Sequence, residues 1–500
     1  MNSGNVAANS ISAPARSEQY PETRGKCGDG RRRVRERAIA AAVLLLAPCL
    51  SASVALGQMK GTSAPQTVRL ATPPATASTA APLTLSLSDA MGRAQKNSPQ
   101  FQAAVTAAKL AKENRVQARA AMLPSLSDLS QYLNTQSNGI SPVGRFVTND
   151  GVHVYRQWAV VRQNMPGSFF IDAGPRLAAY EQAVAKANQE IALRGLNVTV
   201  TQYYYALVVA QRNYAIAEQS LASARRFLQI SQALEQGGEV AHADVIRFQL
   251  EVNTNERALQ NAQLTMEQAR LNLSVLLFPT LNENFTVVDD LDTPPVLPSF
   301  QRAEAMAGRQ NPELAAALNS YHAAGVQVAM AKAAFFPSFS IEFDYGIEAN
   351  HFALKSENTT NPLTEEGVRQ PNLGYFATYS MSFPVWDWGA TLSRLHQAQD
   401  AKALARLDLS YAQRQLMSNL YSYYNEAAIA WNQLGNLRSS VDLAEHNLQL
   451  VTMQYQSGET TVLSVLDAET SLASARTSYA AGEERYRNAL AALQVITGSF

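Results

Sequence analysis

Apolar residues recur at seven-residue intervals along two separated stretches of the chain. The first series consists of Leu207, Tyr214, Leu221 and Leu228, and alanine follows three positions after each of the first three members. Two glycines at 237–238 end this series, and a second one continues as Val245, Val252, Leu259, Met266 and Leu273. Heptad spacing is typical of helices that pack side by side, and paired glycines favour a turn. The pattern predicts a long helix, a tight turn and a returning helix.

The same hairpin pattern recurs about 220 residues further along the chain. Its approach series is Leu434, Val441, Leu448 and Tyr455, and its return series is Val465, Leu472, Tyr479, Tyr486 and Leu493. Gly458 stands between the two series, in the place that Gly238 has in the first hairpin. Two copies in one register indicate an internal duplication.

Proline positions limit how far the helices extend, because proline interrupts a helix interior. None occurs between Pro175 and Pro279 or after Pro384. A helix over residues 176–236 would be roughly 92 Å long, and the return over 240–277 roughly 57 Å. Alanine-rich runs with a proline near their start precede each hairpin and would span about 50 Å as helices. The long helix of each repeat should therefore lie beside two shorter helices that stack end to end.

A period of two replaces the helical period after Pro124 and Pro337. Residues 339–345 and 375–383 alternate apolar and polar side chains, which is typical of strands with one apolar face. Residues 125–134 and 152–165 hold the matching places in the first repeat with a weaker signal. Four strands are fewer than the roughly eight that a barrel needs, so closure requires several chains, and three chains would supply twelve strands.

One strand indicates how such a barrel would face its surroundings. In residues 375–383 we expect Tyr375, Tyr379 and Phe383 to face lipid. The alternating positions Thr378, Ser380 and Ser382 should then face the lumen. Strands of about ten residues with an apolar face suit an outer membrane. Trp386 and Trp388, at the strand-to-helix transition, are better explained by an aromatic girdle at the membrane interface than by a ligand site.

The N-terminal region is predicted to be an export signal that ends near residue 57. A cluster of arginines at 31–37 precedes the apolar run Ala38–Leu46, which is too short to span a membrane. A twin-arginine signal at 31–33 and a lipoprotein signal ending at Cys49 are alternatives with poorer flanking residues. Both cysteines, Cys27 and Cys49, fall in this region, so the mature chain should lack thiols and disulfides.

The remaining chain divides into two repeats and two linkers. Residues 58–84 are rich in alanine, threonine and proline and should form a flexible linker. We place the first repeat at 85–280, a second linker at 281–299 and the second repeat at 300–500. The whole chain has 41 Lys and Arg and 41 Asp and Glu, of which residues 1–57 hold eight and four, respectively. Beyond residue 57 the chain therefore carries 33 basic and 37 acidic residues, a net charge of −4. This balance gives no indication of nucleic-acid binding.

Candidate catalytic chemistry is weak throughout. No phosphate-binding glycine loop and no nucleophile with an adjacent base is recognisable, so we expect no enzyme activity and no cofactor. His242 and Asp244 lie at the same turn, but a metal site needs three or four ligands, so we expect no metal.

Four motifs mark the ends of the predicted elements: Asn311-Pro312-Glu313-Leu314, Phe336-Pro337-Ser338, Phe383-Pro384-Val385-Trp386-Asp387-Trp388-Gly389, and Tyr455-Gln456-Ser457-Gly458 with Val465-Leu466-Asp467. Through these motifs the chain resembles the outer-membrane efflux protein family, the TolC-like outer-membrane factors, over roughly residues 85–500. The resemblance implies a mainly α fold with a small β part. It implies a homotrimer whose duplicated helical hairpins form a periplasmic α-barrel tunnel, and whose strands form a twelve-stranded transmembrane β-barrel in the lipid of the outer membrane.

The resemblance also implies function and partners. Such proteins are the outer-membrane channel of a tripartite efflux or type I secretion system. They dock to a periplasmic adaptor protein and receive substrates from an inner-membrane pump of the RND or ABC class. The family's adaptor-docking region corresponds to the hairpin tips, here Gly237, Gly238, Gly458 and Glu459.

A gate at the hairpin tips closes the tunnel in this family. By alignment, Tyr455 matches a gate tyrosine, Asp244 matches the acid that bonds this tyrosine, and Asp467 matches an acid of a threefold ring. Ser464 and Thr460 replace a second acid and an arginine, so the cationic lock of the family is missing. The alternative is that Tyr455 is only a heptad residue and Asp244 only a favourable charge at a helix N-terminus.

Two other classes of function compete with the channel. A periplasmic coiled-coil scaffold or adaptor protein would share the helices but not the period-two strands. An exported hydrolase would need a catalytic constellation that the sequence lacks. The exported substrate is not specified by either repeat.

Overall fold

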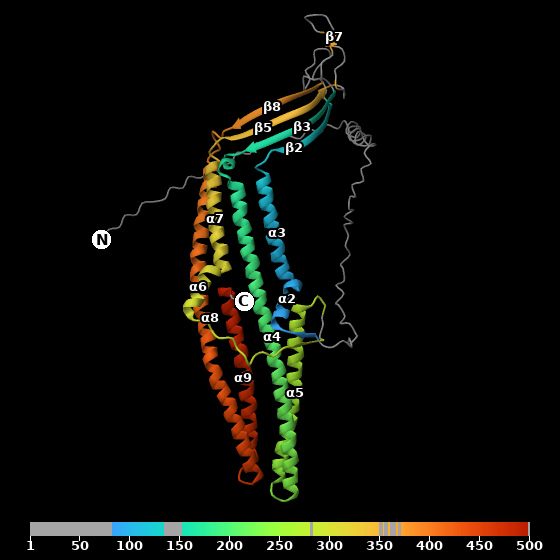
Figure 1. The fold of residues 1–500 in the computed structure, drawn as a ribbon, viewed down its shortest axis with the longest axis vertical. Helices are drawn as coiled ribbons and strands as arrows, with labels where there is room; N and C mark the ends of the chain where they lie inside the picture. Colours follow the sequence, from blue (N-terminus) through green and yellow to red (C-terminus); the bar gives the residue numbers. More distant parts are fainter. Residues whose placement is uncertain are drawn as a thin grey trace, which may run out of the picture. The chain divides into compact units, whose positions relative to one another are not determined.

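The computed structural model describes residues 83–134, 153–280, 284–349, 354, 359–360, 367–368 and 372–498. The predicted signal peptide and nearly all of the 58–84 linker lie outside the described residues. Within residues 71–500, two long helical hairpins and four shorter helices accompany a four-stranded sheet (Figure 1). The chain is mainly α with a small β part, as the sequence predicts.

The first repeat consists of α2 (Leu87–Asn97), α3 (Pro99–Ala120), the long α4 (Ala173–Gln236) and the returning α5 (His242–Leu277). The Ser98 hydroxyl accepts the N–H of Phe101, and Pro99 occupies the first turn, so α3 starts directly after α2. Asn97 Nδ2 donates to the carbonyl of Leu277 at 2.6 Å. The end of α5 therefore meets the α2–α3 junction, and both α3 and α5 contact α4.

The second repeat has the same order of elements. It consists of α6 (Phe300–Gln310), α7 (Pro312–Ala333), α8 (Ala390–Gln456) and α9 (Val462–Thr497). Asn311 accepts the N–H of Leu314 at 2.7 Å and starts α7 as Ser98 starts α3. Helix α8 contacts both α7 and α9. The predicted duplication is thus confirmed at the level of element order, and each long helix lies beside two stacked shorter ones.

The sheet contains β2 (Ser125–Asn134), β3 (His153–Met165), β5 (Ser338–Ala349) and β8 (Leu373–Ser382), all antiparallel and in that order. A separate short pair joins β6 (Thr359–Thr360) and β7 (Gly367–Val368). Figure 1 shows the sheet beyond the ends of α3, α4, α7 and α8, whereas both hairpin turns lie at the opposite end of the helices. All four predicted strands are confirmed, and β2 and β8 are the sheet edges.

Residues directly opposite one another in an antiparallel pair share a face of the sheet. One face, termed here the apolar face, carries Phe339, Ile341, Phe343, Tyr345, Tyr375, Tyr379 and Met381. The other, termed the polar face, carries Ser340, Glu342, Asp344, Thr378, Ser380 and Ser382, with Arg156, Arg162 and Glu348 further along. Arg156 pairs with Glu348 at 2.6 Å, and Arg162 with Glu342 at 2.7 Å. Cross-strand ion pairs therefore line the polar face.

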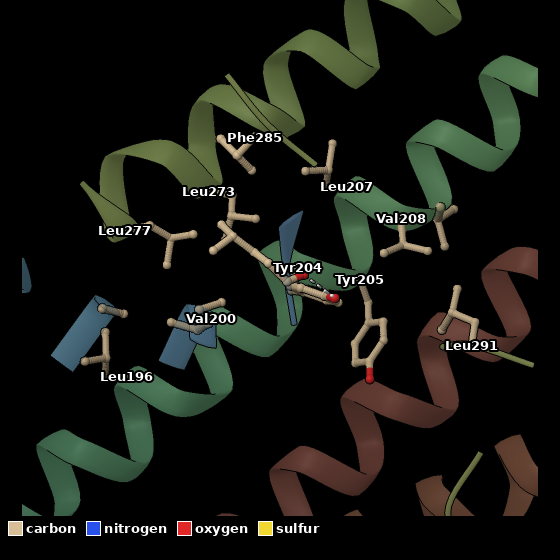
Figure 2. Packing of buried hydrophobic residues seen from close by; sticks show 14 of the residues in the cluster. Leu196, Val200, Tyr204, Tyr205, Leu207, Val208, Leu273, Leu277, Phe285 and Leu291 are labelled. Atoms are coloured by element: carbon tan, nitrogen blue, oxygen red, sulfur yellow. Dashed lines mark hydrogen bonds between the residues drawn. The ribbon is translucent and has the colours of Figure 1, made fainter. Parts of the chain in front are cut away.

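A parallel pair of short strands corrects the predicted linkers. β1 (Leu83–Leu85) pairs with β4 (Phe285–Val287), so the first linker ends before residue 83 and the second contains a strand. Leu85 and Phe285 are buried in a core with residues of α4 and α5 such as Val200 and Leu273. Figure 2 shows this core, with Tyr204 and Tyr205 side by side on α4. The pairing anchors the start of the first repeat and the second linker to α4 and α5.

Candidate functional site

The two hairpin turns have the same geometry. Gly238 and Gly458 are left-handed, with φ of 77° and 76°. The following residue in each turn, Glu239 or Glu459, donates its N–H to a carbonyl five residues back, at 2.9 and 2.8 Å. A left-handed conformation at the end of a helix favours glycine, because glycine has no Cβ that would clash with the backbone. Both turns are exposed, as adaptor docking at these tips would require.

An aromatic cluster joins the two hairpins just inside their turns. We call it the tip cluster: Phe227 of α4, Phe248 of α5, Tyr455 of α8, and Val462 and Val465 of α9. The rings of Phe227 and Phe248 stack at 5.9 Å between centroids, and Phe248 meets Tyr455 edge-on at 6.0 Å. Tyr455 is only 3% exposed. Packing of one hairpin against the other at this level is therefore mainly apolar.

Tyr455 and Asp244 come close together, but the expected hydrogen bond between them is absent among the described residues. The Tyr455 hydroxyl and the Ser231 hydroxyl of α4 are both buried without a hydrogen-bond partner of normal geometry. Burial raises the pKa of Tyr455; the Ser231 hydroxyl opposes this rise, and the negative charge of Asp244 adds to it. Asp244 instead faces Arg247, at 3.7 Å and one helical turn away. The tyrosine thus contacts the first hairpin by packing rather than through a bond to this acid.

Asp467 lies on α9, two residues past the tip-cluster residue Val465. It is exposed, and no ion pair engages its carboxylate among the described residues. Its backbone carbonyl accepts the Ser471 hydroxyl at 2.7 Å. Two residues further, Glu469 lies against Ser223 of α4 and Glu251 of α5. Burial raises the pKa of Glu469 to about 7; the Ser223 hydroxyl opposes this rise and the Glu251 charge adds to it.

Nearer the middle of the helices a second set of contacts joins the two repeats. We call it the charged belt: Arg212 of α4, Glu483 and Arg487 of α9, and Asp289, Asp290 and Asp292 of the second linker. Arg212 reaches Asp289 at 2.5 Å, Glu483 at 2.6 Å and Asp292 at 3.1 Å. The Glu483 side chain is only 2% exposed. Burial raises the pKa of Glu483, whereas Arg212 lowers it.

Buried tyrosines reinforce the charged belt. The Tyr204 hydroxyl donates to the carbonyls of Val288 and Leu85, at 2.7 and 3.2 Å. The Tyr486 hydroxyl of α9 donates to the carbonyl of Pro295 at 2.5 Å. The Arg487 guanidinium lies over the ring of Tyr205, 5.2 Å from its centroid. The second linker is thereby fixed to both α4 and α9.

Two of the predicted lipid-facing residues share the apolar face of the edge strand β8, in which every residue is exposed. Tyr375 and Tyr379 belong to the apolar face and are 72% and 75% exposed, and Phe383 follows directly after β8 at 55%. Phe343 stacks on Tyr375 at 5.7 Å.

Trp386 and Trp388, which were expected to form a girdle, are 75% and 89% exposed and pack edge-on against each other at 5.7 Å. Asp387 between them accepts the N–H groups of Gly389 and Thr391, at 3.1 and 2.7 Å, and so starts α8.

Sequence reasoning missed the charged belt, Phe248 and Glu469. Phe248 follows Val245 by three residues, a spacing that puts both on one helix face, so the heptad could have revealed it. The belt gives no local signal, because Arg212 lies 77 residues from Asp289 and 271 from Glu483. Among the described residues no group of three potential metal ligands occurs. None of the described helices combines the length and apolar character that spanning a membrane requires.

Comparison with known proteins assigns the two repeats. The family model "Outer membrane efflux protein" matches residues 90–277 and 305–499. The chain belongs to the outer membrane efflux protein family. It is 23% identical over 433 residues to the alkaline protease secretion protein AprF of Pseudomonas aeruginosa, which covers 83% of this chain and 84% of AprF. It is also 23% identical over 416 residues to the outer membrane protein TolC of Vibrio cholerae, covering 82% and 89%.

Solved structures support the same fold. The outer membrane protein VceC of Vibrio cholerae superposes with a TM-score of 0.68 at 18% identity, covering 82% of this chain and 96% of VceC. This outer membrane efflux protein is a channel for efflux or type I secretion, located in the outer membrane with a periplasmic tunnel. The family consists of transport conduits rather than enzymes. The four-stranded sheet argues against the alternative of a periplasmic coiled-coil scaffold or adaptor protein, which predicts no strands.

Proposed function

We propose that three copies of this chain form one continuous conduit across the outer membrane and the periplasm. The observation that carries the proposal is the four-stranded sheet, with two unpaired edges and one apolar face. An exposed edge pairs readily with another chain, and only closure removes all edges. Joining β8 of one copy to β2 of the next gives a twelve-stranded barrel with the apolar face toward lipid.

The helices continue this conduit into the periplasm. Helices α4 and α8 contain 64 and 67 residues, which corresponds to roughly 96 and 100 Å. Three copies of the paired hairpins would form a twelve-helix tunnel of matching girth. The exposed turns around Gly237, Gly238, Gly458 and Glu459 would receive the periplasmic adaptor protein. An inner-membrane pump of the RND or ABC class would then supply the substrate.

The gate lies at the tips in this proposal. Tyr455 holds the second hairpin against the first by packing on Phe248, with Asp244 as a charged neighbour. Three copies of the exposed Asp467 would form an acidic ring at the constriction. Carboxylates that converge in a narrow pore attract cations, and multivalent cations most, because the fields of the three chains add.

The assembly is tested with detergent-solubilised protein and two strand variants. Electron microscopy should show a threefold particle with a long helical extension. Tyr379→Arg places a charge on the lipid side and should cost about 2–4 kcal/mol, so the yield of trimer in the outer membrane should drop. Ser380→Arg, its neighbour on the polar face, should assemble normally. A detergent-free monomer, or equal yields of the two variants, would contradict the proposal.

The gate is tested separately in planar bilayers. The wild-type channel should prefer cations and should be blocked by trivalent cations added from the periplasmic side. Asp467→Asn should weaken both properties without lowering trimer yield. If selectivity and block stay unchanged in this variant, Asp467 is only a surface charge on α9.

A further inference from the structure

A short 3₁₀ helix forms a shelf where the strands join the helices. This segment, η1 (Gly167–Ile171), lies between β3 and α4 and packs on the end of α7. A side chain at position 167 would collide with the carbonyl oxygen of Ala333, so η1 is seated directly on this helix end. The Phe170 ring of η1 meets the Phe339 ring of the apolar face edge-on, at 6.1 Å between centroids. The shelf therefore lies on the same side of the sheet as the apolar face.

Two grooves meet at this shelf and share Phe170 and Phe339 as walls. The first, of about 600 Å³, follows the apolar face of the strands along Ile341, Tyr379 and Met381. The second, of about 480 Å³, descends to the helices between η1 and α7 and is walled by Phe336. Each volume lies within the roughly 300–1,000 Å³ of ligand sites. Together they form one apolar path from the strands to the helix ends.

A single charged side chain lies along this path. Lys332, in the last turn of α7, lines the second groove, and the residues lining the first groove are all uncharged. Lys332 is exposed, and within the described residues it makes no ion pair. A cation is favourable at a helix C-terminus, so the dipole accounts for part of its placement. The dipole does not account for the apolar groove that Lys332 lines.

We propose that this path binds one phospholipid from the periplasmic leaflet of the outer membrane. An acyl chain would lie along Ile341, Tyr379 and Met381, and the phosphate would meet the Lys332 ammonium. The path is complementary to a phospholipid, because its apolar grooves suit an acyl chain and its single cation, Lys332, suits the phosphate. A second copy of the chain is a poorer occupant, because it would join at the β2 and β8 edges. The inference rests on the proposed function, which turns the apolar face toward lipid.

Native mass spectrometry of delipidated trimer tests the site with two probes. Dioleoyl phosphatidylglycerol carries the phosphate, and dioleoylglycerol carries the same acyl chains without it. The wild type should retain up to three phosphatidylglycerol molecules per trimer and less of the diglyceride. Lys332→Glu should reduce phosphatidylglycerol retention about tenfold, as expected for loss of a charge-assisted contact, and leave the diglyceride unchanged. Phe336→Ser should reduce both.

Lys109→Glu supplies the matched control, because Lys109 is an exposed lysine of α3 outside both grooves. It should retain both lipids as the wild type does. A normal trimer in which Lys332→Glu keeps its phosphatidylglycerol overturns the site and leaves the proposed function intact. A spectrum that contains only monomer overturns the proposed function together with this site.

Discussion

The two hairpins are held together by different forces at two levels. At the charged belt, Arg212 connects α4 to Glu483 of α9 and to the second linker, and buried tyrosines complete the hydrogen bonding. At the tips, the contact consists of packed aromatic rings and aliphatic side chains, and the Tyr455 hydroxyl has no hydrogen-bond partner of normal geometry.

Ion pairs with fixed hydrogen-bond geometry specify one arrangement, whereas apolar packing tolerates small sliding. This difference indicates that the belt is the fixed level and the tips are the level that can separate. In the proposed conduit the helices would therefore splay at the tips while their middle stays in register.

Removing Arg212, the arginine of the charged belt, should cause the largest loss in the free energy of unfolding. Arg212→Ala would leave the buried Glu483 carboxylate without its cation, which costs about 3–5 kcal/mol. Chemical unfolding followed by circular dichroism should show this loss. Arg225→Ala is the control, because Arg225 pairs with Glu256 at 2.8 Å with both side chains about half exposed. The control should cost at most about 1 kcal/mol. Equal losses in the two variants would show that the belt is no stronger than a surface ion pair.

Truncating Tyr455, the tyrosine of the proposed gate, should loosen the tips without disturbing the belt. Tyr455→Ala removes a ring that is 3% exposed and packs on Phe248, a loss of about 3 kcal/mol. Single-channel conductance should therefore rise. Tyr455→Phe should conduct like the wild type, because the change removes no hydrogen bond of normal geometry. A rise in conductance with Tyr455→Phe would restore a polar latch that involves Asp244 or Ser231.

The smallest change in stability should come from the titration of Glu469, which lies between the two hairpins. Its folded pKa of about 7 exceeds the ordinary glutamate pKa of 4.5, so protonation favours the folded, packed state. This contribution is complete below about pH 4.5 and is lost as the pH rises through about 7. Between pH 5 and pH 8 the loss should be on the order of 2 kcal/mol.

The charged and titratable neighbour of Glu469 across the interface is Glu251 of α5, and Ser223 of α4 is its hydroxyl neighbour. Glu469→Gln should remove this pH dependence and make the tips equally stable at pH 5 and pH 8. Hydrogen exchange of amides in the last turns of α4 and α8 provides the measurement. Unchanged pH dependence in the variant would place the titrating group elsewhere.

Long periodic elements were predictable from the sequence, because their signal is local and repeated. The heptads place both hairpins and the glycines place both turns. The strands of the second repeat stood out because β5 and β8 separate apolar and polar faces cleanly. β2 and β3 gave a weaker signal for a physical reason: on the apolar side Gln157 donates to Asp128 at 2.6 Å, so polar groups satisfy each other there.

Contacts between distant segments could not be predicted in the same way. The charged belt depends on three aspartates of a linker that has no helical or strand period. The gate residues were located through the resemblance, but the surroundings of Tyr455 depend on Phe248 and Ser231 from the other hairpin. Asp244 turned toward Arg247, one turn away on the same helix. Heptad spacing specifies which face of a helix is buried, not which residue of another hairpin will meet it.

The β1–β4 pair has a consequence for the order of events during biogenesis. Thr84 and Thr286 pair although 202 positions separate them. When the chain is translocated with its N-terminus first, residue 287 must therefore have crossed the membrane before β1 acquires its partner β4. Until then the core that contains Leu85, Val200 and Leu273 cannot be completed. Pairing across 202 positions raises the contact order of the first repeat, and a high contact order slows folding, so we expect the β1–β4 pair to form late.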